Sequence, residues 1–455
     1  MEQEGVRGDN PYADAVTALF AERDSPPLCF VRTFGCRQNV SDGEKIAGVL
    51  NSLGCGFTED LSFAAIVVYN TCAVRENAQR RVFGLLGGLK HLKDVKKDVI
   101  TAVCGCMTEQ GHVREEIREK HKYVDLLFGT DGIGELPRLL YELLFEKKAS
   151  PSGTFKSAGT IDEGLPVLRK SRFKADVPVM FGCDNFCGYC VVPYVRGRER
   201  SREPRDIIAE VAALAADGCK EIMLLGQNVN SYGKGLAEEV NFPALLRSID
   251  GLDGDFKIRF RSPHPKDAGK ELIDAIAECG KVCKHLHLPV QSGSDRVLRE
   301  MNRGYTIGQY LEIVRYSRVL MPGFSMSTDV LVGYPNETYD DFKRTLDVLE
   351  YVKFDNIFSF IYSKREGTKA AGIEDKTPEA DKSAWFAELL RKQREIAAEN
   401  NKRFVGKTLE VLFDAEKDGF ISGKSDEFMT VAVPGASGDF LGRREPVVIT
   451  KARIS

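Results

Sequence analysis

The sequence predicts an α/β protein with two regions of alternating strands and helices, followed by a small C-terminal β-barrel. Three observations support this fold class. Short β-rich runs alternate with helical stretches over residues 28–146, the same alternation recurs on a larger scale from about 172 onward, and residues 405–455 change to short strands separated by Gly and Asp turns. Alternation of this kind is typical of parallel sheets, which we therefore expect in the first two regions.

The first region is predicted to be an N-terminal parallel α/β domain over residues 28–147. Its strand candidates are LCFVRTF, AAIVVYN, VITAVC and VDLLF. Helical stretches follow them, such as GEKIAGVLNSLG, which Gly54 closes. Residues 147 to about 172 lose this periodicity and collect Ser, Gly, Lys and Thr, which indicates a connecting segment.

The second region, residues 172–404, is predicted to be a partial (β/α)6 barrel. Its strand candidates are VPVMFG, EIMLLG, FKIRFRS, HLHLPV, SMSTDVLVG and NIFSFIYS. Pro204 and Gly218 stand where a first helix would begin and end. A closed barrel would need two more units, but residues 377–404 read as one long charged helix, so we expect the barrel to be open on one side.

Composition limits the classes of function. With 43% apolar and 29% charged residues the 455-residue chain is typical of a globular protein, and its net charge of −3 gives no global attraction to nucleic acid. No run of eighteen apolar residues appears and the N-terminus is polar, so we expect no membrane association and a cytoplasmic location. In a reducing compartment, twelve cysteines indicate metal ligation or catalysis rather than disulfides.

Three cysteines with CxxxCxxC spacing follow the first strand of the second region: Cys183, Cys187 and Cys190. Structural zinc sites and ordinary 4Fe-4S clusters use four protein ligands, so three thiolates would leave one iron open to bind another molecule. The spacing therefore favours a reactive iron-sulfur cluster. Ordinary buried thiols, or a zinc site completed from elsewhere in the chain, are the alternatives.

A second set of three cysteines follows three consecutive predicted strands of the first region: Cys36, Cys72 and Cys106. Because ligands bind at the carboxyl ends of parallel strands, these thiols should converge and hold a second cluster. Cys104 competes with Cys106, since a period of two puts both on one face. We predict Cys106, in the turn, as the ligand. The remaining cysteines are expected in the core: Cys29, Cys55, Cys104, Cys219, Cys279 and Cys283.

The cysteine loop, with Tyr189 directly before its last Cys, resembles the radical S-adenosylmethionine (SAM) signature. Over nearly its whole length the chain resembles the methylthiotransferase family, in the branch that modifies isopentenyl-adenosine in tRNA. The motifs that carry this resemblance are TFGCRQNVSDGE, NTCAVRENAQRRVFG, CGCMTEQ, CVVPYVRGRERSR, EIMLLGQNVNSYG, HLPVQSGSDRVLREMNRGYT and DVLVGYPNET. Arg37, Gln38, Gly43 and the SKREGT stretch depart from the usual pattern of the family.

The resemblance implies an N-terminal cluster domain, a radical SAM core and a C-terminal TRAM domain at residues 405–455. It also implies two 4Fe-4S clusters and two uses of SAM. One SAM gives a methyl group to a sulfur, and another yields the radical that removes hydrogen from carbon 2 of the adenine next to the anticodon. The expected partners are the tRNA anticodon stem-loop and a reducing electron donor, and we expect a monomer.

Five residues are predicted to contact SAM or RNA. Gln227 and Gln291 stand at the ends of core strands where SAM should bind, and Tyr189 should lie near its adenine. Loop capping or turn formation is the alternative for these residues. Arg196 and Arg198 belong to a dense group of five arginines that ends at Arg205, and guanidinium groups suit the SAM carboxylate or RNA phosphates. Solvated charge at a helix start is the alternative for that group.

Two other functions remain open. The same chemistry on threonylcarbamoyl-adenosine tRNA or on a ribosomal protein would use the same cysteines. A non-catalytic iron-sulfur protein that binds RNA, and carries electrons or senses oxidants, would explain the cysteines but not two sites that each lack a fourth ligand.

Overall fold

The chain divides into two compact units, which are described separately. The computed structural model describes residues 10–74, 76–148, 153, 155, 161–435 and 438–453. Unit 1 consists of the chain up to Lys170 with Phe181–Asp184 and Val191–Arg200, and unit 2 of Ser171–Met180, Asn185–Cys190 and the chain from Ser201 onward. Residues 149–152, 154 and 156–160 of the expected connecting segment lie outside the described residues. The three predicted domains and their boundaries stay a prediction.

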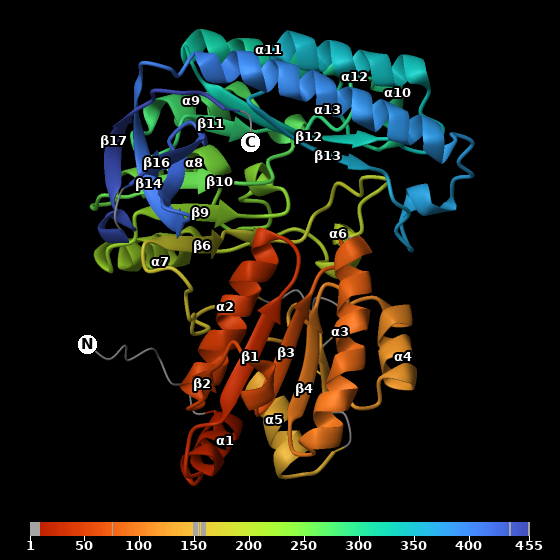
Figure 1. Ribbon diagram of the computed structural model, residues 1–455, viewed down its shortest axis with the longest axis vertical. Coiled ribbons are helices and arrows are strands. Elements are labelled where there is room, and N and C mark those ends of the chain that lie inside the picture. Colours follow the sequence, from red (N-terminus) through yellow and green to blue (C-terminus); the bar gives the residue numbers. More distant parts are fainter. Residues whose placement is uncertain are drawn as a thin grey trace. The chain divides into compact units, whose positions relative to one another are not determined.

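Unit 1 contains a five-stranded, fully parallel sheet in the order β2-β1-β3-β4-β5 (Figure 1). Its strands are β1 (Leu28–Thr33), β2 (Gly56–Phe57), β3 (Ile66–Thr71), β4 (Ile100–Gly105) and β5 (Leu126–Phe128). Every residue of β3 and β4 is buried, as is typical of central strands in a parallel sheet that is covered on both faces. The predicted parallel α/β fold of this region is confirmed.

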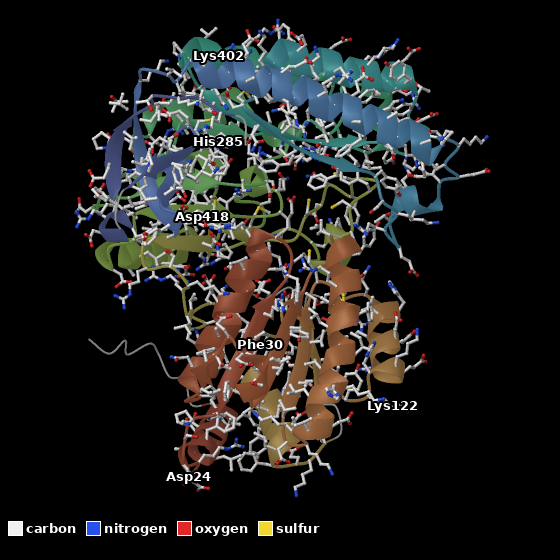
Figure 2. All side chains as sticks on the ribbon, in the orientation of Figure 1. Asp24, Phe30, Lys122, His285, Lys402 and Asp418 are labelled. Carbon is white, nitrogen blue, oxygen red and sulfur yellow. The ribbon has the colours of Figure 1, made fainter. Side chains whose placement is uncertain are left out.

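Helices cover both faces of this sheet. They are α1 (Pro11–Ala21), α2 (Arg37–Ser52), α3 (Glu76–Val95), α4 (Gly111–Lys120) and α5 (Leu136–Leu144). Val68 packs with residues of α1, α2 and α5, whereas its neighbour Val67 packs with residues of α3 and α4, because successive strand residues face opposite ways. Figure 2 shows the side chains between these layers, with Phe30 of β1 labelled. Helix α1 was not predicted from the sequence.

Unit 2 contains six barrel strands arranged as two three-stranded parallel sheets, β10-β9-β6 and β11-β12-β13. A parallel bridge between Ile258 and Val282 joins their edges. The strands are β6 (Lys174–Pro178), β9 (Glu221–Leu225), β10 (Lys257–Phe260), β11 (His285–His287), β12 (Ser325–Val332) and β13 (Asn356–Ile361). The predicted partial barrel is therefore confirmed. Two short strands, β7 (Met180–Phe181) and β8 (Arg200–Ser201), form a separate pair.

Helices line the outer face of these strands (Figure 1). They are α7 (Pro204–Ala216), α8 (Phe242–Asp250), α9 (Lys270–Glu278), α10 (Asp295–Glu300), α11 (Ile307–Leu320), α12 (Tyr339–Val352) and α13 (Glu379–Lys402). The long helix predicted at 377–404 is α13, and its Trp385 stacks on Phe342 of α12 with ring centroids 5.7 Å apart. A single helix thus covers β12 and β13 where a closed barrel would add two further units. No helix in the described part of the chain is long and apolar enough to cross a membrane.

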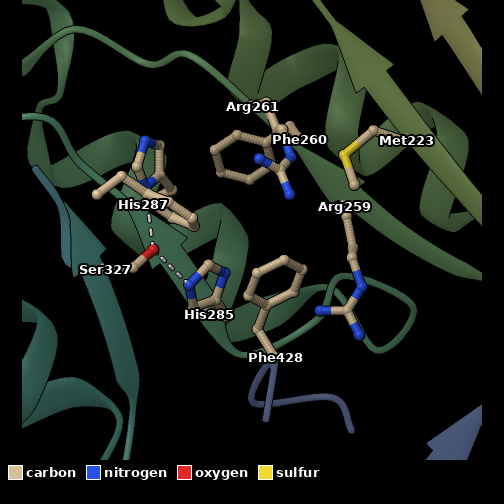
Figure 3. A pocket seen from close by; sticks show the side chains of 9 residues that line it. Met223, Arg259, Phe260, Arg261, His285, His287, Ser327 and Phe428 are labelled. Carbon is tan, nitrogen blue, oxygen red and sulfur yellow. Dashed lines mark hydrogen bonds between the residues drawn. The ribbon is translucent and has the colours of Figure 1, made fainter. Parts of the chain in front are cut away.

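The C-terminal strands form an open antiparallel sheet in the order β16-β15-β14-β17. They are β14 (Thr408–Lys417), β15 (Phe420–Ser425), β16 (Thr430–Pro434) and β17 (Arg444–Val448). This module docks at the amino ends of the barrel strands, where Lys174 pairs with Asp414 and Lys257 with Asp426. Figure 3 shows Phe428, from the turn after β15, inserted into a cavity between Arg259 and His285.

Candidate metal centres

The three predicted cysteine ligands of unit 1 lie at the carboxyl ends of adjacent strands. Cys36 is the N-cap residue of α2 after β1, Cys72 follows β3, and Cys106 follows β4. The β3–β4 register pairs Thr71 with Gly105, so Cys72 and Cys106 stand at equivalent positions one residue further on. Parallel strands that end at one edge therefore bring these cysteines together, as predicted.

Asn39, in the first turn of α2, holds this group together. Its Oδ1 accepts hydrogen bonds from Cys36 Sγ at 3.5 Å and from Cys106 Sγ at 3.6 Å. Its Nδ2 donates to the carbonyl of Thr71 at 2.7 Å, next to Cys72. One fully buried amide thus contacts two of the thiols and the residue before the third.

Gly35 explains how the loop after β1 approaches Cys72. Its φ of +114° favours glycine, and a Cβ at this position would lie 2.3 Å from Cys72 Cβ and 2.7 Å from Cys72 Sγ. A larger residue would displace the thiol. The loop therefore packs directly against the Cys72 side chain.

Arg196 supplies a buried positive charge beside these thiols. Its Nε donates to Cys106 Sγ at 3.1 Å, and its Nη2 donates to Asn39 Oδ1 at 3.0 Å and to Asp42 Oδ2 at 2.5 Å. A hydrogen bond with Cys72 and the Arg196 charge lower the pKa of Cys36 to about 6, whereas burial raises that of Cys106 to about 11. SAM binding by Arg196 stays a prediction, and the structure gives its side chain these other partners.

Cys104, the competitor of Cys106, lies inside β4. It is fully buried in the apolar cluster shared with α1, α2 and α5, and burial raises the pKa of its thiol. Cys106, by contrast, packs with Ala73 and two valines of the segment that carries Arg196. The choice of Cys106 as the ligand stays a prediction, and the contact of Arg196 with its thiol supports it.

The donor set suits an iron-sulfur cluster. Soft thiolates are the ligands that iron-sulfur clusters prefer, and glycine at position 35 leaves room beside the Cys72 thiol. Within the described ranges, no three His, Cys, Asp or Glu side chains lie close enough together to hold a single metal ion.

The CxxxCxxC loop is fixed by backbone hydrogen bonds within each unit. In unit 1 the Cys183 N–H donates to the carbonyl of Gly197 at 3.1 Å. In unit 2 the Cys190 N–H donates to the carbonyl of Cys187 at 2.9 Å, and the Gly188 N–H donates to that of Met301 at 2.8 Å. Ligation of one cluster by all three of these cysteines stays a prediction.

Arg303 and His264 lie near this loop in unit 2, and the sequence analysis assigned them no role. Arg303 Nη1 donates to Cys187 Sγ at 3.5 Å and to Tyr189 Oη at 3.4 Å. The ring of His264 lies against Tyr305, and its Nε2 has no hydrogen-bond partner among the described residues. Burial lowers the pKa of His264 to about 2, which keeps the ring neutral. The only sequence signal for Arg303 was its place in the MNRGYT part of a family motif.

Gln227 and Gln291 lie beyond the carboxyl ends of barrel strands, as predicted. Gln227 follows β9, and Gln291 follows β11 with a left-handed φ of +64°. The Gln291 backbone bonds to Asp329 and Leu331 on β12 at 2.9 Å each. Residues held in this conformation cluster at functional sites, although the same bonds also fit a turn. SAM contact by either glutamine stays a prediction.

The arginine group after the cysteine loop is ion-paired throughout. The pairs are Arg196–Asp42, Arg198–Asp184, Arg200–Asp131, Arg202–Glu210 and Arg205–Asp206. Only Arg198 and Arg205 have largely exposed side chains, at 74% and 83%. These two remain as candidates for RNA contact.

Two regions of the chain match known family models. Residues 177–349 match the model of the Radical SAM superfamily, and residues 29–129 match Uncharacterized protein family UPF0004. The chain is 45% identical over 429 residues to the tRNA-2-methylthio-N(6)-dimethylallyladenosine synthase of Clostridioides difficile (strain 630), covering 94% of this chain and 90% of that protein. It is 46% identical to that of Clostridium novyi (strain NT), covering 93% and 94%.

Solved structures share the fold. The radical S-adenosylmethionine methyltransferase TsrM from Kitasatospora setae superposes with a TM-score of 0.56 at 15% identity, over 77% of this chain and 75% of that one. The cobalamin-dependent S-adenosylmethionine radical enzyme OxsB gives a TM-score of 0.53 at 13% identity, over 81% and 56%. At these identities the likeness concerns the fold alone.

Proposed function

This chain belongs to the family of tRNA-2-methylthio-N(6)-dimethylallyladenosine synthases, and we propose that it adds a methylthio group to carbon 2 of isopentenyl-modified adenosine next to the tRNA anticodon. The observation that carries the proposal is the group of three cysteines around Asn39, in a chain that also has the CxxxCxxC loop of a radical SAM core. A radical generator alone would need only the loop.

The two groups of cysteines have separate roles in this proposal. Cys183, Cys187 and Cys190 hold the 4Fe-4S cluster that binds SAM, and Cys36, Cys72 and Cys106 hold a second 4Fe-4S cluster. When bound, SAM and the clusters supply hydrogen abstraction, the sulfur and the methyl group. The chain's own residues bind these groups: Asn39 aligns two thiols, and Arg196 places a cation at Cys106.

We propose that five residues contact SAM: Tyr189, Gln227, Gln291, Arg196 and Arg198. The bonds of Arg196 described above use its Nε and Nη2. Support comes from the positions of the glutamines at strand carboxyl ends and from the contact of Arg303 with Tyr189. A guanidinium suits the SAM carboxylate because it donates two parallel hydrogen bonds.

The proposed partners follow from the reaction. The relatives' names specify tRNA, so we propose the anticodon stem-loop as substrate, with a contribution from a TRAM-like C-terminal module. Reduction of the SAM-binding cluster requires an electron donor. We propose a monomer that acts in the cytoplasm, where its tRNA substrate is found.

The deciding experiment is anaerobic incubation of the reconstituted protein with SAM, dithionite and isopentenyl-modified tRNA, followed by nucleoside mass analysis. We expect a methylthio-bearing nucleoside and 5′-deoxyadenosine. Threonylcarbamoyl-adenosine tRNA and a ribosomal protein mixture serve as alternative substrates, and a product from either of them alone would contradict the proposal. Absence of 5′-deoxyadenosine would favour the non-catalytic alternative.

Cysteine variants separate the two centres. Replacing Cys36, Cys72 and Cys106 together by Ala should abolish the methylthio product while 5′-deoxyadenosine still forms. Cys187→Ala should abolish both products, because this substitution removes the radical source.

A further inference from the structure

Arg303 is a buried cation whose hydrogen bonds all go to neutral groups or to a thiol. It lies three residues beyond α10 and is 5% exposed. Its Nη2 donates to the carbonyl of Pro289 at 3.0 Å and its Nε to Tyr305 Oη at 3.5 Å, while Nη1 faces Tyr189 Oη and Cys187 Sγ. Tyr305 is fixed in turn by a 2.6 Å bond to the carbonyl of Val290.

The other buried arginines have carboxylate partners. Arg196 pairs with Asp42, Arg202 with Glu210 and Arg259 with Glu221. Among the described residues, no Asp or Glu forms an ion pair within 4.0 Å of the Arg303 guanidinium. A buried charge without an opposite charge is strongly unfavourable, so its position requires an anion in the functional state. The cysteine sulfur that Arg303 contacts is Cys187 Sγ, 3.5 Å from Nη1.

We propose that Arg303 is the counter-charge of the iron-sulfur cluster held by Cys183, Cys187 and Cys190, and stabilises its reduced form. The inference rests on the proposed function for the presence of that cluster. Each added electron makes a thiolate-bound cluster more negative, and a hydrogen-bonded cation beside a ligand sulfur raises its reduction potential. Arg303 is thus a positioning residue that acts through Cys187, and its bond to Tyr189 holds that ring beside the same sulfur.

The reduction potential tests this role directly. The full-length protein with Cys36, Cys72 and Cys106 replaced by Ala carries only the cluster of interest, and its midpoint is measured by redox titration followed by electron paramagnetic resonance. Arg303→Gln should reduce the equilibrium constant for reduction about tenfold, which is ~59 mV more negative for one electron. Arg303→Lys, which keeps the charge, should shift the midpoint less.

Arg299→Gln is the matched control, because Arg299 is an exposed arginine of α10 that loses the same charge. A merely structural role for Arg303 predicts lower stability with an unchanged midpoint. Equal midpoints for Arg303→Gln and Arg299→Gln would therefore overturn the proposal. A normal midpoint without SAM, combined with weaker SAM binding, would also overturn it and make Arg303 a SAM ligand.

A second measurement tests the same contact without a substitution at Arg303. It remains possible even if the Arg303→Gln protein does not retain its iron. Protein grown with ¹⁵N-arginine should show a weakly coupled ¹⁵N nucleus in pulsed resonance spectra of the reduced cluster. Absence of this coupling overturns the inference. If the protein with Arg303 unchanged assembles no cluster, the result counts against the proposed function itself. This outcome is known before any Arg303 variant is made.

Discussion

At the residue scale, the unit 1 cysteines depend on polar side chains that link separate strand ends. Through Nδ2, Asn39 donates to the carbonyls of Phe34, directly after β1, and of Thr71, the last residue of β3. Through Oδ1 it accepts from two thiols and from Arg196. Both N–H groups of the amide are used, and three donors share the two acceptor sites of its oxygen. The presence of Asn39 in the TFGCRQN motif is thus explained by its contacts with two strand ends and two cysteines, and not by a preference for helix.

The choice between Cys104 and Cys106 gives the first prediction. Cys106→Ala should lose the second cluster, about half of the iron and sulfide of a protein with two four-iron clusters. Cys104→Ala should keep both clusters, because that thiol lies in the apolar core of unit 1. Iron and sulfide analysis after reconstitution measures the difference. The reverse result would show that Cys104 is the ligand.

Glu337, before α12, gives a prediction of pH dependence. It is buried, and burial raises the pKa of its carboxyl to about 7, although the Gly333 N–H donates to it at 2.5 Å. Nearby Asp341 raises the pKa further and Arg296 opposes it. Since the folded-state pKa lies above the unfolded one, the protein loses stability as pH rises from about 4.5 to about 7.

Glu337→Gln keeps an acceptor for the Gly333 N–H and removes this titration. Its free energy of unfolding, relative to the original protein, should rise by about 2–3 kcal/mol between pH 5 and pH 8. Urea unfolding at both pH values measures the change. Glu312→Gln, at an exposed position of α11, is the control for the substitution. A constant difference at Glu337 would mean that its carboxyl titrates normally.

At the element scale, the turn between β15 and β16 joins the C-terminal module to the barrel. Phe428 has a left-handed φ of +67°, stacks on His285 at 4.8 Å, and has Lys424 4.7 Å from its ring centre. Arg259 donates to the carbonyl of Ser425 in the same turn at 2.7 Å. A bulky residue in this conformation is strained, and its contacts with the barrel hold it there.

Phe428→Ala should therefore loosen the docking of the module. We expect a loss of about 2 kcal/mol, less than for a fully buried Phe, with faster amide exchange in β14–β17 and little change in the barrel strands. Hydrogen exchange with mass analysis measures both. Phe420→Ala is the control, since Phe420 of β15 is 43% exposed in the same module. Equal effects of the two substitutions would show that Phe428 has no docking role.

Strands β3 and β4 were predictable from their apolar runs, and helix α13 was predictable because residues 377–404 form one long charged helical stretch. The convergence of Cys36, Cys72 and Cys106 was predictable because parallel strands end at one edge. Helix α1 was missed: it is short, and burial of Val16 and Phe20 against α5 and its neighbours stabilises it. The contacts of Arg196 with Asp42 and of Arg303 with Cys187 could not be predicted, because they depend on how distant parts of the chain come together in the fold.

At the scale of the whole molecule, charge argues against a general electrostatic mode of RNA binding. The net charge is −3, and each of the five arginines that made the densest basic stretch has a carboxylate partner. Three of these pairs hold largely buried arginines and serve the fold. Recognition of tRNA must then depend on few phosphate contacts, together with shape and with the modified base itself.

The salt dependence of tRNA binding tests this conclusion. If Arg198 and Arg205 each contact one phosphate, the double substitution Arg198→Gln and Arg205→Gln should reduce the slope of log K against log salt by about 1.5–2. Filter binding from about 50 to 200 mM salt measures the slope. Replacing exposed Lys120 and Lys122 by Gln removes the same charge from the α4 end and is the control. A general electrostatic attraction depends on the total charge of the protein. Equal changes of the slope in the two double variants would therefore mean that tRNA binding responds to overall charge. A change confined to the arginines would place phosphate contacts at the segment that follows the cysteine loop.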